Sequence, residues 1–244
     1  MLSMVAVLPE PPLLVPELAT GAAAETVGLR AACVAAAGRL AGAASRWIAV
    51  GADAGGRRTV GPDARGSFAG FGVDVVVGLD TVGPGSTAPV DPWLPLPLLV
   101  AGWVAEAAGV AVRVRGELVA PDEPPPACAA LGAALAAECA AAPEPVGLLV
   151  LGDGAATHVA KAPGSLDEHA TPFDTEVAVA LRDVDPVALA GLDVDLAAEL
   201  FAGGRAPWQV LAGATACGTW SGELLHSSAP FGVTYHVALW TPAP

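Results

Sequence analysis

The sequence predicts a single α/β domain in which a central, mostly parallel or mixed sheet is flanked by helices. Apolar runs of strand length alternate along the chain with helix-length, alanine-rich stretches, and 244 residues suit one large domain. The composition agrees, because 54% of the residues are hydrophobic and only 15% are charged, which favours collapse into a core. Aromatic residues make up only 5%, so we expect small side chains and closely packed elements.

The first half of the chain supplies the elements that begin the sheet. A strand over residues 3–8 is closed by Pro9, and the alanine-rich stretch 25–44 is expected to be a helix. The segment 80–97 holds five prolines and is expected to be a loop. Further strands are predicted at 47–50, 73–79 and 110–114, and a further helix at 98–108.

The second half continues the alternation. The sequence PDEPPP at 121–126 predicts a turn before a helix over 127–142, and it is the best candidate for a domain boundary. We prefer one domain, because the flanking pieces look like parts of one sheet. The apolar run 146–151 is typical of a strand buried on both faces, and a glycine-rich polar loop is expected over 152–171. Further helices are predicted at 173–182, near 195–201 and from Pro207, and closing strands at 219–225 and 233–240.

The charge of the chain argues against two classes of partner. There are 25 acidic residues against 11 basic ones, for a formal net charge of −14, and Lys161 is the one lysine. A chain this acidic repels phosphate backbones and anionic membrane surfaces. We therefore expect neither a nucleic acid nor a membrane as partner.

Two apolar segments invite interpretation as targeting or membrane elements. The N-terminus, MLSMVAVLPEPPLL, lacks a basic region and indicates a strand and loop rather than a signal peptide. The most hydrophobic window, 94–112, is long enough to span a membrane, but it contains Glu106, Pro95 and Pro97. A buried helix followed by a strand is the favoured interpretation, and we expect a cytoplasmic protein.

The cysteines are Cys33, Cys128, Cys139 and Cys217, and they form no C-x-x-C pair. Their spacing indicates reduced, small core residues of a cytosolic protein rather than a disulfide framework or a zinc site. Cys128 and Cys139 lie 11 residues apart, or three helical turns, so we expect them on one face of their helix.

Three loops that follow predicted strands carry unusual polar residues. Glu10 follows the first strand and Asp53 the second, and GDGAATH, with Asp153, Thr157 and His158, follows the buried strand. In an open α/β sheet, ligands bind beyond the carboxyl ends of the strands. We therefore expect Glu10, Asp53 and His158 to line one pocket at that edge, with Asp153 and Thr157 as further pocket residues.

Each candidate also has a purely structural interpretation. An acid such as Glu10 is more often a solvated loop residue, and an aspartate such as Asp53 is more often a turn residue or helix cap. His158 is the strongest candidate, because the chain has four histidines and this one lies in a glycine-rich loop after a buried strand. His169 is expected to be a surface loop residue, and His236 to lie on a solvated or half-buried face of a closing strand.

A series of motifs along the chain resembles a known family. It comprises PPLLVPEL after the first strand, VGAD at the second, GSFAGFGVDV, LPLPLLVAGW, LGDGAATH with APGSLDEHATPFD, RAPWQVLAGA and APFGVTYHVALW. Together these motifs resemble the catalytic B-subunit (LigB-like) superfamily of class III extradiol ring-cleavage dioxygenases, and most closely an alanine-rich actinobacterial branch. The resemblance covers most of the chain, is loose between residues 115 and 145, and implies one domain with that fold over residues 1–244.

The resemblance implies a non-haem Fe(II) oxidoreductase acting on aromatic diols. In the family, histidines after the first two strands and a late glutamate hold the iron, and a further histidine acts as acid and base. Glu10 and Asp53 stand where the two metal-binding histidines would be, and His158 matches the acid/base histidine. The late glutamate would fall at 206–209, where the residues are Ala, Pro, Trp and Gln. A carboxylate set prefers another divalent metal, Mg²⁺, Mn²⁺ or Ca²⁺, over redox iron.

Two functions fit the sequence. One is an enzyme of the superfamily that processes a small aromatic or polar ligand, with His158 as the catalytic acid and base. The other is a non-catalytic binding or assembly protein that keeps the dioxygenase fold without iron. Self-association into a homo-oligomer is expected in either case.

Overall fold

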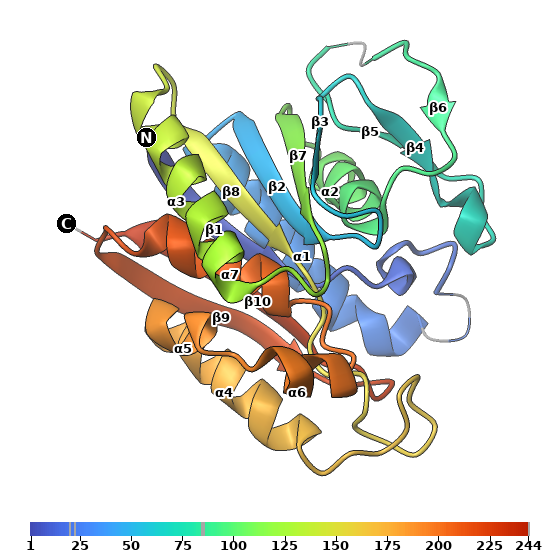
Figure 1. The fold of residues 1–244 in the computed structure, drawn as a ribbon. Helices are drawn as coiled ribbons and strands as arrows, with labels where there is room; N and C mark the ends of the chain where they lie inside the picture. Colours follow the sequence, from blue (N-terminus) through green and yellow to red (C-terminus); the bar gives the residue numbers. More distant parts are fainter. Residues whose placement is uncertain (20, 22, 84–85, 244) are drawn as a thin grey trace.

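The computed structural model describes residues 1–19, 21, 23–83 and 86–243. Seven strands form its main sheet (Figure 1). They are β1 (Leu2–Leu8), β2 (Arg46–Ala52), β3 (Arg58–Val60), β7 (Arg113–Val119), β8 (Val146–Leu151), β9 (Trp220–Ser228) and β10 (Tyr235–Pro242). A separate small sheet contains β4 (Arg65–Ser67), β5 (Val76–Gly78) and β6 (Val90–Asp91).

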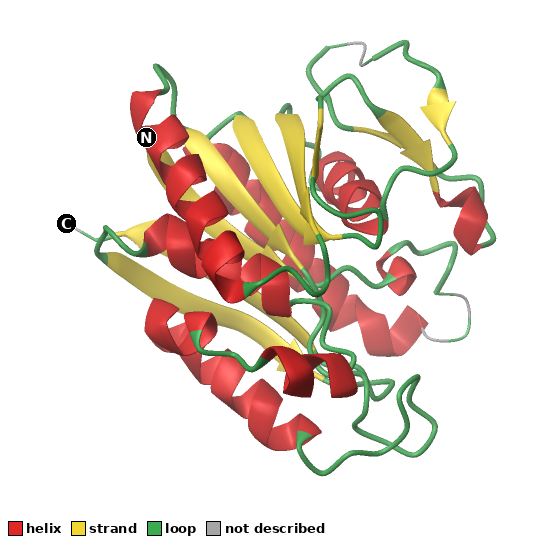
Figure 2. Ribbon diagram, viewed as in Figure 1, coloured by secondary structure: helices red, strands yellow, loops and turns green. Residues whose placement is uncertain are grey.

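Helices cover both faces of the main sheet (Figure 2). The α-helices of the described chain are α1 (Ala23–Ala43), α2 (Leu96–Ala107), α3 (Pro125–Ala141), α4 (Ala170–Asp183), α5 (Pro186–Ala190), α6 (Val194–Glu199) and α7 (Arg205–Thr215). Two 3-10 turns accompany them, η1 (Pro12–Leu14) and η2 (Phe68–Phe71).

The main sheet is mixed, with the order β3-β7-β2-β8-β1-β10-β9. The central strands β7, β2, β8 and β1 run parallel. Antiparallel pairing adds β3 at one edge, and β10 followed by β9 at the other. The single-domain α/β architecture with helices on both faces confirms the predicted fold class. Because β1, β2 and β8 are parallel neighbours, the loops after them leave the same edge of the sheet.

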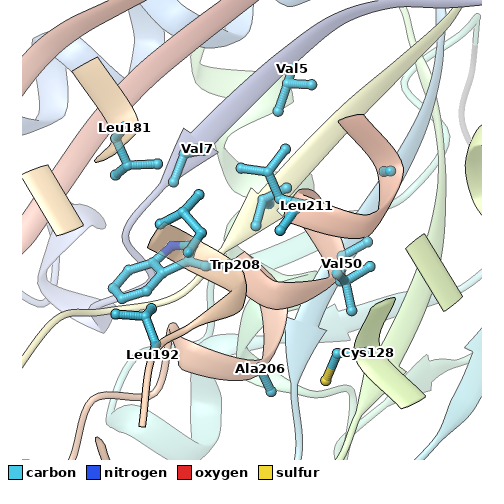
Figure 3. Close-up of a cluster of buried hydrophobic side chains, with 14 of the residues drawn as sticks. Val5, Val7, Val50, Cys128, Leu181, Leu192, Ala206, Trp208 and Leu211 are labelled. Carbon is cyan, nitrogen blue, oxygen red and sulfur yellow. The ribbon is translucent and has the colours of Figure 1, made fainter. Parts of the chain in front are cut away.

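Side chains that alternate along each strand build two cores. On β1, Val5 and Val7 face the core beneath α3, α4, α5 and α7, whereas Ala6 and Leu8 face the core beneath α1 and α2. Trp208 of α7 lies deep in the first core, beside Val7 and Leu192 (Figure 3). Every residue of β8 is buried, as the continuous apolar run predicts.

The apolar window 94–112 forms a helix and not a span. Helix α2 is 12 residues long and buries nine of them. Within the described part of the chain, no helix combines the length and apolarity needed to cross a membrane. Gly109 ends the helix in the left-handed region with φ of 63°, and the Val110 N–H turns back to the Ala105 carbonyl.

Two strand predictions are wrong in position. The strand predicted at 110–114 starts at Arg113 and continues to Val119, because Gly109 and Val110 close α2 and Val112 bonds to Thr81 instead. The strand predicted at 73–79 shrinks to β5 and belongs to the small sheet rather than the main one. The predicted loop 80–97 contains β6 and the start of α2, and its residues 84 and 85 lie outside the described chain.

All four cysteines are free. Cys33, Cys128 and Cys139 are buried, and the latter two share the buried face of α3, as their spacing predicts. The predicted core position is wrong for Cys217, which is exposed because α7 ends at Thr215 and the chain turns at the surface toward β9.

Candidate functional site

The loop that follows β8 is joined by backbone hydrogen bonds to the segment that leads into β10. The Gly154 N–H donates to the Thr234 carbonyl at 2.8 Å, and the Thr234 N–H donates to Ala155 at 3.0 Å. The His158 N–H donates to the Gly232 carbonyl at 3.2 Å. These bonds satisfy backbone groups beyond the strand ends and fix the position from which the His158 side chain projects.

His158 lies against a carboxylate that the sequence analysis missed. Its Nε2 is 2.6 Å from Oδ2 of Asp174 and 2.7 Å from Oγ1 of Thr234. Asp174 comes from α4, where it is the one charged side chain on the buried face, with 5% of its surface exposed. We call His158, Asp174, Thr234 and the neighbouring His236 the histidine cluster.

Asp174 is held in its charged form. Burial raises the pKa of its carboxyl, but contacts from His236, Thr234 and His158 and the Ala155 N–H outweigh burial, and the pKa falls below its ordinary value. The Ala155 N–H donates to Oδ1 at 3.1 Å. A carboxylate with several donors retains its charge even in a buried position.

His236 completes the cluster from β10 and is buried, with 1% of its surface exposed. The predicted solvated or half-buried position is therefore wrong. Its Nε2 is 3.7 Å from Oδ1 of Asp174, an electrostatic contact too long for a hydrogen bond, and its Nδ1 is 3.0 Å from Oγ of Ser227. The edge of Trp208 packs beside its ring, with centroids 6.1 Å apart.

This geometry prepares His158 to accept a proton. A carboxylate on Nε2 favours the tautomer with hydrogen on Nε2, which leaves the lone pair on Nδ1. No described residue forms a hydrogen bond with Nδ1 of His158. The His158 side chain retains 15% of its exposure and lines a hollow of about 300 Å³ together with Thr171, Ser227 and Thr234.

A second polar group, which we call the carboxyl pair, consists of Glu10 and Asp153. The Glu10 N–H donates to Oδ1 of Asp153 at 2.8 Å, so the loop after β1 is tied to the loop after β8. Oε2 of Glu10 is buried without a hydrogen-bond partner among the described residues. This carboxyl lies over the end of β2, since a Cβ added to Gly51 would stand 3.8 Å from Oε2.

Both carboxyls of the pair hold protons more tightly than ordinary acids. Burial raises the pKa of Asp153 to about 7, against one opposing hydrogen bond from Glu10. Burial, then repulsion by Asp153 and Asp53, raises the pKa of Glu10 well above its usual value. The charge of Asp153 also contributes, after burial, to the raised pKa values of Cys33 and Tyr235.

Asp53 lies beside the carboxyl pair but has partners of its own. Its Oδ2 forms an ion pair with Arg58 at 2.8 Å and accepts the Gly55 N–H at 2.9 Å. The latter contact is the turn role expected of an aspartate in a glycine-rich loop. Asp53 nevertheless acts on Glu10, whose pKa it helps to raise.

The structure thus relates Glu10 to Asp53 and Asp153, and His158 to Asp174. Among the described residues, no hydrogen bond or ion pair joins His158 to Glu10 or Asp53. That these three side chains line one pocket stays a prediction. Successive residues of β10 lie near the two groups, Tyr235 near Asp153 and His236 near Asp174, because they point to opposite faces of the sheet.

Two further residues considered in the sequence analysis, Thr157 and His169, lie outside both groups. Thr157 is 1% exposed, and its Oγ1 has no hydrogen-bond partner in the described chain. His169 is exposed at the start of α4, where its Nδ1 lies 2.8 Å from Oδ1 of Asp167, so the expectation of a surface residue is confirmed.

The residues present do not fit the iron site that the family resemblance implies. Redox iron in such sites needs imidazole ligands, and the group formed by Glu10, Asp153 and Asp53 contains only carboxyls, two of which hold protons tightly. Asp53 is also engaged by Arg58. Within residues 1–19, 21, 23–83 and 86–243, no group of three or more His, Cys, Asp or Glu is arranged to hold a metal ion.

Comparisons with known proteins assign no family to the chain. No family model matches the chain, and no curated protein matches it. Among solved structures, it is similar to the crystal structure of the uncharacterized protein JW3007 from Escherichia coli K12, with 15% sequence identity and a TM-score of 0.49. The similarity covers 98% of this chain and 99% of that one. Membership of a named family stays a prediction from the sequence motifs.

Proposed function

We propose that the protein is a divergent member of the class III extradiol dioxygenase superfamily that transfers a proton on a small polar or aromatic ligand without using the family's iron. His158 is the catalytic acid and base, and Asp174 is its positioning residue. The observation that carries this proposal is the distance of 2.6 Å between Nε2 of His158 and Oδ2 of Asp174 at the wall of a hollow.

The proposed chemistry follows from the tautomer. His158 with hydrogen on Nε2 takes a proton from the ligand at Nδ1, and the resulting imidazolium is stabilised by the Asp174 carboxylate. The proton then returns from Nδ1 to another atom of the ligand. General acid and base help of this kind contributes roughly 10²–10⁴-fold to a rate.

The walls of the hollow favour a polar ligand. Four residues that carry hydroxyl groups line it, namely Thr171, Thr175, Ser227 and Ser228. Arg182 also lines it, but its guanidinium is paired with Asp183 at 2.7 Å. Hydroxyls donate and accept hydrogen bonds, so they suit a ligand rich in oxygen atoms, such as a phenol or a hydroxy-carbonyl compound.

NMR of the imidazole nitrogens tests the proposed role of His158. In the native protein at neutral pH, we expect the Nε2–H tautomer at His158, and in Asp174→Asn a mixture of tautomers. His169→Gln, at the exposed histidine, is the matched control and should leave the His158 signals unchanged. An Nδ1–H tautomer in the native protein would contradict the proposal, because Nδ1 would then have no lone pair to accept a proton.

Oxygen uptake tests the second part of the proposal, that the protein does not use the family's iron. After anaerobic reconstitution with Fe(II), we expect no ring cleavage of a catechol panel at the rate of an extradiol enzyme, because the imidazole ligands are missing. Brisk, stoichiometric cleavage would show that the iron is held by other histidines.

The second candidate function is a binding or assembly protein that keeps the fold without catalysis. The observation that favours it is the engagement of Asp53 by Arg58 and of Asp153 by the Glu10 N–H, which gives two of the carboxyls structural roles. A protein of this kind would be cytoplasmic and self-associating. Tight ligand binding that survives His158→Gln with no chemical change in the ligand would favour this alternative.

A further inference from the structure

A second hollow lies away from the histidine cluster, between the loop ahead of α3 and the segment that joins α6 to α7. Its volume is about 330 Å³, at the small end of the range for ligand sites. Its wall is mainly apolar, with side chains from Val194, Ala198, Phe201 and Ala202. A small apolar body would fit this space.

Arg205, the first residue of α7, lies in the wall of this hollow with 2% of its surface exposed. Its Nη1 donates to the Glu123 carbonyl at 2.6 Å and to Oε1 of Gln209 at 2.8 Å, and its Nη2 donates to the Pro121 carbonyl. These bonds fix the guanidinium in place. No hydrogen bond of its Nε appears within the described chain.

The charge of Arg205 has no close counter-ion. The chain has 25 acidic residues, yet no carboxylate of the described residues lies within 4 Å of this guanidinium. Burial is the main influence on the Arg205 pKa and lowers it, while Cys128 and then Asp122 and Glu123 oppose that shift. A buried cation without a paired anion is costly, because it has lost water and gained only neutral partners.

Phe201 at the hollow is held in an unusual conformation. Its φ of 54° lies in the left-handed region, and 61% of its surface is exposed. A left-handed residue at this position closes α6, because the Phe201 N–H donates to the Ala198 carbonyl and the Ala202 N–H to the Ala197 carbonyl. The Phe201 ring packs near Gly164, because a Cβ added there would stand 2.6 Å from the ring.

We propose that this hollow binds a small monocarboxylic acid, whose carboxylate accepts hydrogen bonds from Arg205 and whose apolar body lies against Val194, Ala198 and Phe201. The planar guanidinium matches the two oxygens of a carboxylate. A single negative charge fits better than a phosphate, because Asp122 lies in the same wall and the whole chain carries a charge of −14. This site is independent of the proposed proton transfer at His158.

Titration calorimetry with octanoate and octanol as probes tests the proposal on the whole chain. We expect octanoate to bind saturably and about tenfold more tightly than octanol, because only octanoate brings the counter-ion. Asp122→Asn removes a repelling charge and should tighten octanoate binding by roughly twofold to fivefold. Equal binding of both probes, or weaker octanoate binding by Asp122→Asn, would overturn the proposal.

Two further variants locate the site. Gly203 lines the hollow, and a Cβ added there meets nothing within 4 Å, so Gly203→Leu should fold, fill the space and weaken octanoate binding at least tenfold. Arg205→Met should have the same effect if it folds. Arg39→Met removes an exposed arginine that lines neither hollow, so it is the matched control and should leave the affinity unchanged. Octanoate binding unaffected by Gly203→Leu, or no saturable binding in the millimolar range, rejects the site.

Discussion

The carboxyl pair and the histidine cluster each contain a buried carboxyl that lies at the loop after β8, and the pKa values of these two carboxyls shift in opposite directions. Asp153 accepts one backbone N–H and neighbours a second acid, and its pKa rises to about 7. Asp174 accepts the Ala155 N–H and lies against His158 and Thr234, and its pKa falls below its ordinary value. The number of donors around a buried carboxyl, more than its burial, therefore decides whether it keeps its charge.

The largest expected effect comes from Asp153→Asn. The folded protein holds the Asp153 proton up to about pH 7, whereas the unfolded chain loses it near the ordinary value of 3.8, so this residue makes stability fall as pH rises between the two. Asparagine still accepts the Glu10 N–H through its oxygen. We expect the variant to be more stable than the native protein above pH 7, by up to about 4 kcal/mol, and equally stable near pH 4.

Urea unfolding across that pH range measures the effect. Asp63→Asn, at another loop aspartate, is the control and should follow the native pH profile. If Asp153→Asn destabilised the protein at every pH, Asp153 would be a charged, stabilising carboxylate and the comparison would fail.

The next largest effect is a loss of stability, which we expect from Asp174→Asn. Since the folded-state pKa of Asp174 is lowered, its stabilising contribution is present above the ordinary value of 3.8 and is lost as pH falls through the folded-state value. We expect a loss of about 3 kcal/mol at pH 7, because charged hydrogen bonds to His158 and Thr234 are replaced by neutral ones. The difference from the native protein should shrink in acid.

The matched control is Asp183→Asn, at an exposed residue of the same helix, which should leave stability essentially unchanged. A difference at Asp174 that stays constant down to pH 2 would show that the carboxylate is not the source of the stabilisation.

A smaller effect is expected from Gly154→Ala, which crowds the histidine cluster without changing a charge. A Cβ at Gly154 would stand 2.4 Å from Oδ1 of Asp174 and 2.9 Å from Cβ of Thr234. We expect a loss of about 1–3 kcal/mol in thermal or urea unfolding, together with altered NMR signals of His158. Gly203→Ala, where a Cβ meets nothing within 4 Å, should be silent in both readouts. Unchanged His158 signals in Gly154→Ala would show that Gly154 does not set the geometry of the histidine cluster.

The smallest effect belongs to the ion pair of Asp53 and Arg58, which borders the carboxyl pair at the surface. With 39% of the Arg58 side chain exposed, Arg58→Gln should cost about 0.2–1 kcal/mol, less at high salt. A loss above about 2 kcal/mol in urea unfolding would mean that Arg58 also neutralises Glu10.

The sequence predicts the fold where one signal dominates. Strand β8 coincides with the apolar run 146–151, and α3 begins within the proline-rich sequence 121–126. Short strands such as β3 and β6 were not predicted, because two or three residues carry no detectable alternation. Residues 110–112 look like a strand by composition, but the Val110 N–H closes α2. Val112 exchanges hydrogen bonds with Thr81, which lies 31 residues earlier, so no local pattern contains them.

The candidate site was predicted in part for the same reason. His158 and Asp153 stand out because they follow a recognisable buried strand. Asp174 was missed because its partner lies 16 residues away, and only the folded chain brings α4 against that loop. One signal was available, since Asp174 is a charged residue on the apolar face of α4, beside Phe173 and Val177. A charge in that position requires a partner.

Carboxyl-selective ¹³C NMR titration of Asp153 and Asp174 in one sample tests the central contrast most directly. We expect Asp153 to titrate near pH 7 and Asp174 below its ordinary value of 3.8, so that at pH 5 the first is protonated and the second is ionised. An ionised Asp153 at pH 5, or an Asp174 that titrates above Asp153, would contradict it.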